Sequence, residues 1–436
     1  MKIGMISLGC AKNRVDSENL LGRLKAAGHE FVDDPAQADA IFVNTCGFIE
    51  DAKQESIDAI LEMAAARKKG AKLLVTGCLA QRYSDALMEE IPEIDGLLGV
   101  KDYDKALSLL DSDIRESYTS GTERFPDGER ILTTPPYSAF VKISDGCDNR
   151  CSYCAIPLIR GRYLSRPYEE IVDECERLAE GGVTEITLIA QDTSRYGNDI
   201  YGKTRMSELL RRVAAIEKVK WVRVLYCYPD RVTDRLIETI ARQPKAVHYF
   251  DIPVQHASGH VLRDINRRGD KESILEMCRR IREKIPDVVL RTTLIAGFPT
   301  ETEEDFAKLC ELVQEARFDR LGCFAYSQEE DTPAGELEQL PEELRQRRAE
   351  IIMELQMSAA FDFADRCIGR TLEVLAEGCE DGQYYGRSYM DAPDIDTKVY
   401  FTSENEIEPG SYLPVLITDT CDYDLIGIAQ PKEEAK

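Results

Sequence analysis

Short apolar runs alternate with helical repeats of apolar residues along the first part of the chain. The pattern predicts strands over residues 2–7, 40–44 and 72–76. It predicts helices between them, over 17–27 and 49–69, each followed by a glycine that suits a helix end. Strands and helices in this order favour an α/β fold with a doubly wound parallel sheet.

A second alternation of strands and helices occupies the middle of the chain. Its predicted strands are 139–143, 185–189, 221–225, 247–252, 288–295 and 319–324. Its predicted helices are 168–180, 206–216, 231–242, 271–285 and 303–316. Six β/α units are fewer than the eight of a closed barrel, so we expect a partial (β/α)6 barrel with a laterally open mouth.

Two breaks in the pattern divide the chain into domains. Residues 113–136 are rich in Ser, Thr, Gly, Asp and Pro, which predicts a linker after an N-terminal domain over 1–112. The core would then span 137–366 and close with a long helix over 341–366. Residues 367–436 carry short β-like runs between Gly, Pro and Asp, which predicts a small all-β barrel.

Composition and charge narrow the classes of function. The 436 residues are 43% apolar and carry a formal net charge of −25. That balance disfavours a generic nucleic-acid binder and favours a basic partner. Residues 370–436 hold fifteen acidic and five basic side chains, a net charge of −10. No apolar run approaches the ~18 residues of a membrane span, and the first residues lack a signal segment, so we expect a cytoplasmic protein.

Three of the fourteen cysteines form a compact motif. Cys147, Cys151 and Cys154 are spaced C-x3-C-x2-C directly after the first core strand. Three thiolates on one short loop can occupy three corners of a soft metal centre. Structural zinc would require a fourth ligand, and none is near in the sequence. We therefore favour an iron–sulfur cluster with one open iron over zinc.

Three further cysteines share one position in successive β/α units. Cys10, Cys46 and Cys78 each follow one of the first three strands. Because parallel strands end at the same edge of a sheet, we expect the three thiols to converge on a second cluster. Three unrelated core cysteines are the alternative. The other cysteines show no grouping and are interpreted as packing residues: Cys175, Cys227, Cys278, Cys310, Cys323, Cys367, Cys379 and Cys421.

Polar residues and one glycine follow other core strands at the same expected edge. They are Gln191, Asp192, Gln255, His256 and Gly297. The polar side chains could bind a polar cofactor, or they could cap the next helix. We expect His256 to form hydrogen bonds rather than to bind metal. Arg223 lies within a strand, and we expect it to point into the barrel toward a carboxylate.

With Tyr153 before its last cysteine, the C-x3-C-x2-C loop resembles that of the radical S-adenosylmethionine superfamily. The contexts Gly-Cys-Ala-Lys-Asn, Asn-Thr-Cys-Gly-Phe and Thr-Gly-Cys-Leu-Ala-Gln narrow the resemblance to the methylthiotransferases. These contexts surround Cys10, Cys46 and Cys78 in turn. The resemblance covers almost the whole chain. It implies an N-terminal cluster domain, a radical core and a C-terminal TRAM barrel.

The resemblance implies two 4Fe–4S clusters and S-adenosylmethionine as cofactors. One cluster, on Cys147, Cys151 and Cys154, would bind S-adenosylmethionine at its open iron and cleave it on reduction to a 5′-deoxyadenosyl radical. The other, on Cys10, Cys46 and Cys78, would carry the sulfur to be inserted, and a second S-adenosylmethionine would supply the methyl group. By position, the candidate contacts to S-adenosylmethionine are Tyr153, Gln191, Asp192, Arg223, Gln255 and Gly297.

Two branches of this family act on different substrates. The RimO branch methylthiolates the β-carbon of an aspartate in small-subunit ribosomal protein twelve, and the MiaB branch modifies isopentenylated adenosine in transfer RNA. Residues 221–229, 251–258 and 392–396 resemble the RimO branch. The acidic C-terminal barrel favours the same branch, because it would repel RNA and attract a basic ribosomal protein. The expected partners are that protein, a reductant and a sulfur source, with no RNA outside the ribosome and no membrane.

Two other classes of protein remain as alternatives. An iron–sulfur electron carrier would need no group transfer, but such carriers usually fill all four cluster corners with cysteine. Two sets of three cysteines argue against it. A zinc-binding scaffold is the third possibility.

Overall fold

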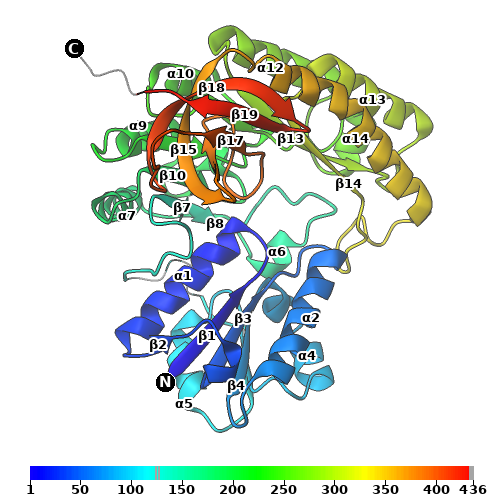
Figure 1. Cartoon of the computed structure of the whole chain (residues 1–436). Coiled ribbons are helices and arrows are strands. Elements are labelled where there is room, and N and C mark those ends of the chain that lie inside the picture. Colours follow the sequence, from blue (N-terminus) through cyan, green and yellow to red (C-terminus); the bar gives the residue numbers. More distant parts are fainter. Residues whose placement is uncertain (123–124, 126–127, 432–436) are drawn as a thin grey trace.

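The computed structural model describes residues 1–122, 125 and 128–431 and arranges them in three units (Figure 1). The N-terminal unit is coloured blue to cyan, the core green to yellow, and the C-terminal barrel orange to red. Part of the predicted linker therefore falls outside the described residues. Within the described part of the chain, no helix is both long and apolar enough to cross a membrane.

The N-terminal unit is a parallel sheet with helices on both faces, as predicted. Its strand order is β2-β1-β3-β4-β5-β6. The strands are β1 Lys2–Ser7, β2 Glu30–Phe31, β3 Ala40–Thr45, β4 Lys72–Gly77, β5 Gly96–Leu98 and β6 Glu116–Tyr118. One face packs against α1 Ala11–Ala26 and α5 Ala106–Asp111, and the other against α2 Glu50–Ala66, α3 Cys78–Arg82 and α4 Ser84–Glu90. Strand β6 lies in the range predicted as linker.

Helix α1 begins at Ala11, directly after Cys10, whereas the apolar pattern predicted a start at residue 17. Its first turns are polar, so they show no apolar repeat. In the fold these polar side chains are buried: Lys12, Asn13, Asp16, Ser17 and Glu18. Asp16 and Glu18 pair with Lys142 and Arg130 of later segments. The helix therefore presents a polar face to the core, and the predicted boundary was wrong for that reason.

The core is a partial (β/α)6 barrel, as predicted. Its strands run in the order β7-β10-β11 and β12-β13-β14, and a parallel bridge between Val222 and Ala246 joins the two groups. The strands are β7 Ser138–Lys142, β10 Glu185–Ile189, β11 Trp221–Val224, β12 Tyr249–Asp251, β13 Val289–Ala296 and β14 Arg320–Ala325. The helices outside them are α7 Tyr168–Glu180, α9 Met206–Ala214, α10 Asp234–Arg242, α12 Lys271–Lys284 and α13 Glu303–Ala316.

Short elements occupy the loops of the core, and a long helix closes it. The short ones are β8 Ser144–Asp145, β9 Leu164–Ser165, α6 Ile156–Ile159, α8 Asn198–Tyr201 and α11 Gly259–Asp264. Helix α14 spans Glu342–Asp365 and packs on β14 and α13. The C-terminal barrel is closed in the order β15-β16-β17-β19-β18. Its strands are β15 Thr371–Glu380, β16 Gln383–Ser388, β17 Val399–Thr402, β18 Tyr412–Cys421 and β19 Asp424–Ala429.

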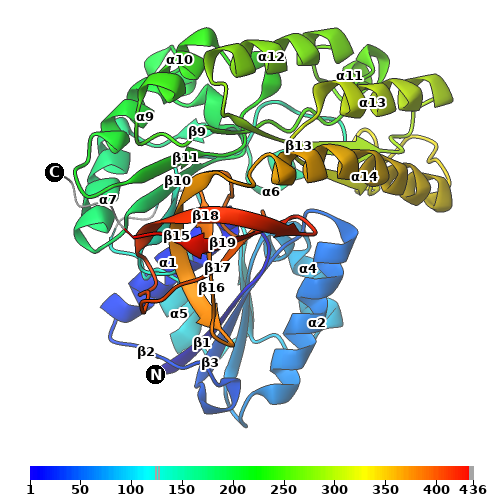
Figure 2. The same ribbon diagram turned by 45° about the horizontal axis from the view of Figure 1, so that its top comes forward.

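The C-terminal barrel packs against the open side of the core (Figure 2). It shares one hydrophobic cluster with inward-facing residues of the core strands and with Val15 of α1. Arg387 donates to Glu185 of β10 at 2.6 Å, and Asp391 accepts from Arg320 of β14 at 2.8 Å. The mouth that we expected to be open at the side is therefore partly covered by this domain.

Candidate functional site

The structure brings Cys10, Cys46 and Cys78 to one edge of the N-terminal sheet. Strand β1 is in register with β3 up to the pair Ser7 and Asn44, and β3 with β4 up to Thr45 and Gly77. The three strands thus end level, and each cysteine follows its strand end. A Cβ atom at Gly9 would lie 3.2 Å from Cys46 Sγ, so the loops that carry Cys10 and Cys46 are in contact.

Nearby cations oppose the effect of burial on these thiols. The protein packed around Cys10 raises the pKa of its thiol, but the charges of Lys12 and Arg160, together with hydrogen bonds from the backbone N–H groups of Asn13 and Lys12, lower the pKa overall. Burial raises the pKa of Cys78 to about 12, although Arg160 opposes the rise. Burial also raises the pKa of Cys46, and the negative charge of Cys10 adds to it. The negative charge of Cys10 acts on both other thiols, as expected for neighbours at one site.

The second trio lies on the loop between β8 and α6. Cys147 N–H donates to Gly161 O at 3.1 Å, and Cys154 N–H donates to Cys151 O at 3.0 Å. Asn149, between the first two cysteines, donates from its side chain to Asp192 at 3.0 Å. Burial raises the pKa of Cys147 to about 11 and that of Cys154 further still. Hydrogen bonds thus fix the loop at several points, and the protein around it shields the Cys147 and Cys154 thiols from water.

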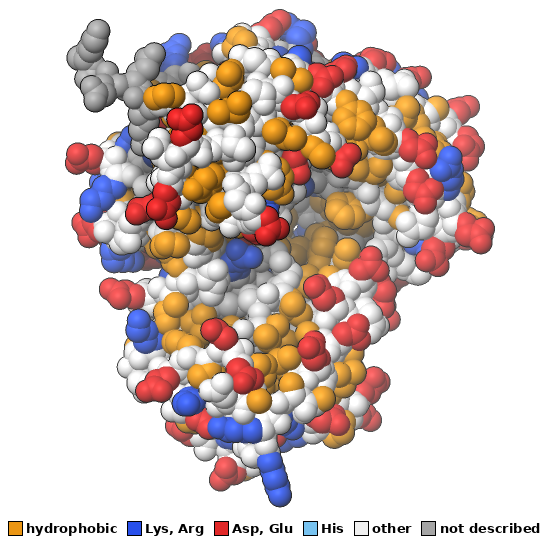
Figure 3. Space-filling view, viewed as in Figure 1, with side chains coloured by type: hydrophobic (Ala, Val, Ile, Leu, Met, Phe, Trp, Pro, Cys, Tyr) orange, Lys and Arg blue, Asp and Glu red, His pale blue; other side chains and the backbone are white. Residues whose placement is uncertain are grey.

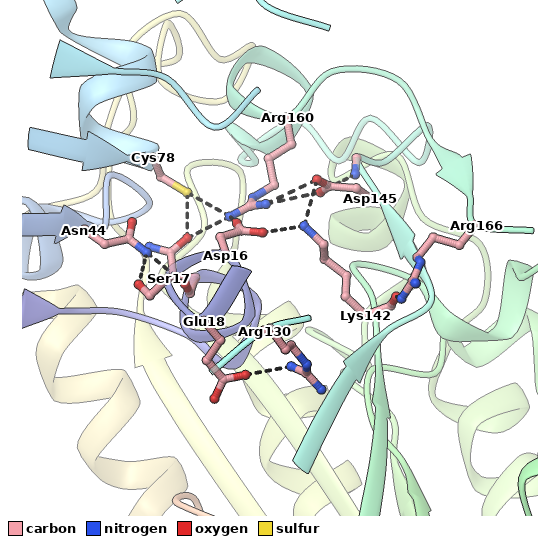
Figure 4. Close-up of polar contacts among 12 residues, drawn as sticks. Asp16, Ser17, Glu18, Asn44, Cys78, Arg130, Lys142, Asp145, Arg160 and Arg166 are labelled. Carbon is pink, nitrogen blue, oxygen red and sulfur yellow. Dashed lines mark hydrogen bonds and ion pairs between the residues drawn. The ribbon is translucent and has the colours of Figure 1, made fainter. Parts of the chain in front are cut away.

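A buried polar network extends from Cys78 of the N-terminal trio to Asp145, two residues before the core trio (Figure 4). Arg160 donates to Asn13 Oδ1 at 2.7 Å and pairs with Asp16 at 2.8 Å, both on α1. It also pairs at 3.3 Å with Asp145, two residues before Cys147. Lys142 pairs with the same two carboxylates, at 2.5 Å with Asp16 and 3.3 Å with Asp145. The N-terminal unit and the core therefore dock through side chains next to both trios.

A hollow separates the N-terminal unit from the rest of the molecule on the face shown in Figure 3, and hydrophobic side chains line much of it. A contiguous apolar surface in a hollow is typical of sites that bind another molecule.

Three family models match successive parts of the chain. Uncharacterized protein family UPF0004 matches residues 2–99, the Radical SAM superfamily residues 141–313, and the TRAM domain residues 368–429. A curated relative from Lachnoclostridium phytofermentans, "Ribosomal protein uS12 methylthiotransferase RimO", is 46% identical over 99% of this chain and 100% of its own length. Its namesake from Clostridioides difficile is 48% identical over 98% of each chain. The chain belongs to the RimO family of radical S-adenosylmethionine methylthiotransferases.

Solved structures support the same fold at lower sequence similarity. The radical S-adenosylmethionine methyltransferase TsrM from Kitasatospora setae, bound to tryptophan and a SAM analogue, has a TM-score of 0.56 and 14% identity. It covers 87% of this chain and 79% of its own. At that identity the likeness shows the fold alone.

Family membership brings two 4Fe–4S clusters and S-adenosylmethionine as cofactors. The donors present fit them, because each trio offers soft sulfur ligands with cations beside them. Lys12 and Arg160 lie by the N-terminal trio, and the Arg267 guanidinium acts on the thiols of the core trio. Among the described residues, no three His, Cys, Asp or Glu side chains lie close enough to hold a single metal ion.

The structure places the polar candidates at the C-terminal ends of the core strands. Gln191 donates to Asp145 at 3.2 Å. Asp192 is fully buried, accepts from Asn149 and is ion-paired with Arg231. Its carboxylate therefore holds the cysteine loop, which the sequence did not reveal. Gln255 forms a parallel bridge to Leu294 of β13 with a positive φ of 70°.

Gly297 and His256 meet at one buried carboxylate. Gly297 N–H donates to Glu301 at 3.1 Å, and His256 Nε2 lies 2.9 Å from the same carboxylate. Arg348 of α14 pairs with Glu301 at 2.7 Å. His256 is thus a hydrogen-bonding residue, and Glu301 ties the loop after β13 to its neighbours.

Arg223 and Tyr153 lie in different surroundings. Arg223 points into the barrel, 3.5 Å from Glu185, and donates to Tyr389 O of the C-terminal barrel at 2.9 Å. These contacts direct the guanidinium toward the C-terminal barrel, and its Nε and Nη2 atoms have no hydrogen-bond partner among the described residues. Tyr153 packs with the cluster-loop cysteines and with Phe298 in a small apolar group.

Sequence reasoning missed the residues of the connecting network. Asn13, Asp16 and Arg160 were not singled out, because none follows a strand end or repeats a spacing. One signal was present: the first turns of α1 are densely polar yet directly follow Cys10. A polar helix start beside a candidate cluster ligand indicates a helix face that packs on charged groups.

Proposed function

We propose that this enzyme adds a methylthio group to the β-carbon of an aspartate in ribosomal protein uS12. The relatives at 46–48% identity carry that substrate in their names and match over nearly their full length. The observation that carries the chemistry is the pair of cysteine trios, with a buried network that runs from Cys78 of one to Asp145 beside the other. We also propose that the reaction takes place in the cytoplasm.

In this proposal each cysteine trio holds one cluster. Cys147, Cys151 and Cys154 hold the radical cluster, and Cys10, Cys46 and Cys78 hold the second. When bound, the clusters and S-adenosylmethionine supply an electron, a hydrogen-abstracting radical, and the sulfur and methyl groups of the product.

The protein's own part is to place and protect these groups. Asp192 and Arg231 fix Asn149 and with it the loop of the core trio. Glu301 fixes the backbone at Gly297. Gln191, Gln255, Gly297 and Tyr153 are the proposed contacts for S-adenosylmethionine. The three residues Gln191, Gln255 and Gly297 follow strand ends of the core, where ligands bind in α/β folds.

The C-terminal barrel offers an acidic end to a basic partner. Its β15–β16 turn carries Glu380 and Asp381, and the loop after β17 carries Glu404, Glu406 and Glu408, all exposed. The antiparallel register of β16 and β17 brings this turn and this loop to the same end of the barrel. A hydrogen bond from Ile407 N–H in the loop to Tyr384 OH on β16 holds the loop there. Such a surface steers a Lys- and Arg-rich protein toward the enzyme and repels nucleic acid. We propose that uS12 approaches by this end.

One parallel assay tests the substrate. The reconstituted enzyme, S-adenosylmethionine, sulfide and a low-potential reductant are incubated anaerobically with small ribosomal subunits or with isopentenylated transfer RNA. We expect mass spectrometry to find a methylthio group on an aspartate of uS12 and none on the RNA. Addition on the RNA alone would overturn the substrate and leave the two-cluster chemistry standing.

Cysteine variants test the two trios separately. We expect Cys10→Ala to abolish methylthiolation but to leave 5′-deoxyadenosine formation, because the core trio is intact. Cys147→Ala should abolish both. Cys379→Ala, which changes an exposed cysteine of the C-terminal barrel, serves as the control and should retain both. Normal sulfur insertion by Cys10→Ala would show that the second cluster is assigned wrongly.

A further inference from the structure

One buried arginine lies between the two trios. The Arg160 side chain is 1% exposed and follows directly after α6. Its guanidinium bonds Asn13 and Asp16 of the N-terminal unit and Asp145 of the core. Figure 4 shows the contacts with the two carboxylates. Because a guanidinium is planar and carries five donors, it can bind several acceptors in fixed directions at once.

Arg160 also reaches a sulfur atom of the N-terminal trio. Its Nη2 lies 3.6 Å from Cys78 Sγ. The same sulfur lies 3.3 Å from Asn13 Oδ1, which is an acceptor, and the Asn13 amide is held by donation to Thr45 O at 2.9 Å. A thiolate or a cluster sulfur accepts hydrogen bonds and cannot donate them. Of these two neighbours, Arg160 is therefore the one that stabilises an anionic sulfur.

The charges around Arg160 are balanced. Arg160 and Lys142 face the carboxylates of Asp16 and Asp145, and all four side chains are nearly fully buried. Without the arginine, the remaining three groups would carry a net negative charge beside Cys78. Buried charges are weakly screened, so that change would act on anything held by the sulfur.

We propose that Arg160 is a positioning residue that sets the reduction potential of the N-terminal cluster. The proposal rests on the proposed assignment of that cluster to Cys10, Cys46 and Cys78. A cationic N–H donor beside a cluster sulfur favours the more negative, reduced state and so raises the potential. The same guanidinium binds Asp145 next to the loop of the core trio. One side chain therefore affects both the potential of the N-terminal cluster and the distance between the loops that carry Cys78 and Cys147.

The test uses the full-length chain with Cys147, Cys151 and Cys154 changed to Ala, so that a single cluster remains. Anaerobic redox titration followed by electron paramagnetic resonance gives its midpoint potential. Arg160→Gln in this background should lower the equilibrium constant for one-electron reduction of the cluster at least tenfold. This corresponds to a shift of the midpoint potential by about 59 mV toward negative values. Arg160→Lys keeps the charge but loses the planar fork, and should shift the potential less.

Arg130 provides the matched control. Its side chain is 4% exposed. It donates to Glu18 of α1 at 2.6 Å and to Phe140 O of β7 at 2.6 Å, and so joins these two elements. Arg130→Gln should therefore loosen the same helix without changing the potential. Equal shifts in Arg130→Gln and Arg160→Gln would overturn the proposal, because general loosening would then account for both.

Iron content separates this proposal from the proposed function. If the cysteine-to-alanine background binds no iron, the assignment of the N-terminal cluster fails. If it binds a cluster and Arg160→Gln keeps that cluster at the parent potential, the role of Arg160 fails while the assignment stands. If Arg160→Gln loses its iron, the Arg160→Lys variant decides. A midpoint potential that moves in the negative direction, by less than the shift expected for Arg160→Gln, supports the proposal. An unchanged midpoint potential overturns it.

Discussion

Gly77 is the residue on which the geometry of the N-terminal trio depends most directly. It ends β4 with φ +99°, and an added Cβ would lie 2.2 Å from Asn44 Oδ1 and 2.4 Å from Thr45 O. Gly70 precedes the same strand with φ +83° and has nothing within 4 Å of its Cβ position. The two glycines thus share a left-handed backbone and differ in the space around them.

This difference predicts different results for two alanine variants. Gly70→Ala should cost about 1–2 kcal/mol of unfolding free energy, the strain of a left-handed alanine. Gly77→Ala should cost more, because backbone atoms must move, and it should displace Cys78 and reduce the iron bound by the N-terminal trio. Urea denaturation and iron per chain measure both effects. Equal costs, with iron retained in Gly77→Ala, would contradict the prediction.

At the scale of single residues, the sequence predicted positions at strand ends and missed positions at domain contacts. The six cysteines of the two trios could be grouped because spacing and parallel strands are local or topological rules. Asp192 follows a strand end as well, yet its binding of Arg231 and Asn149 depends on two distant loops. Arg160 is harder still, since its partners on α1 lie more than a hundred residues away.

Helix α13 shows how one element depends on its first turn. Thr302 caps it by accepting from Asp305 N–H, and Asp305 accepts in return from Thr302 N–H at 3.1 Å. Burial raises the pKa of Asp305, but hydrogen bonds from Ser258, Thr302 and His260 outweigh it and lower the pKa below its ordinary value of 3.8. The charged form of this carboxylate therefore stabilises the native state.

The sign of the pH dependence follows from that lowered pKa. The contribution of Asp305 is complete above the ordinary pKa and is lost as pH falls through the native one. Asp305→Asn should cost about 2 kcal/mol near neutral pH, the typical loss of hydrogen bonds to a charged group. The difference in unfolding free energy between wild type and variant should stay constant above the ordinary pKa of 3.8 and narrow as the pH falls below it. Urea denaturation of the iron-free protein at several pH values measures it, and a constant gap would refute the assignment.

At the scale of elements, apolar periodicity located strands and helices well where one face meets an apolar core. Tyr168–Glu180 and Glu303–Ala316 were predicted to the residue. Helix α1 was predicted too short because its first turns bury polar groups against polar groups. In the C-terminal barrel, tyrosine, glycine and exposed positions interrupt the apolar pattern of β16 and β19, so the pattern indicates these two strands only weakly.

The whole molecule modifies the argument from net charge. Several acidic residues of the C-terminal barrel pair with basic residues of the other two units and so offer no free charge to a partner. The pairs are Glu373 with Lys220, Asp391 with Arg320, Asp394 with Arg14 and Asp396 with Arg291. The sequence could not distinguish these from the free ones, because the pairing depends on how the units dock. Exposed carboxylates outside these pairs remain at the β15–β16 end and at the opposite end of the barrel, and these can act at a distance.

This distinction leads to a prediction about binding of the ribosomal protein. Glu404 and Glu406 lie at the β15–β16 end, whereas Asp419 and Asp422 lie at the opposite end of the same barrel, and all four are exposed. Changing Glu404 and Glu406 to Gln should raise KM for the small subunit with kcat unchanged, because rim charges act mainly on association. The effect should fade at high salt, where exposed charges are screened.

Changing Asp419 and Asp422 to Asn removes the same charge and should leave KM within error. Equal increases in both variants would show that net charge, and not this end of the barrel, guides the substrate.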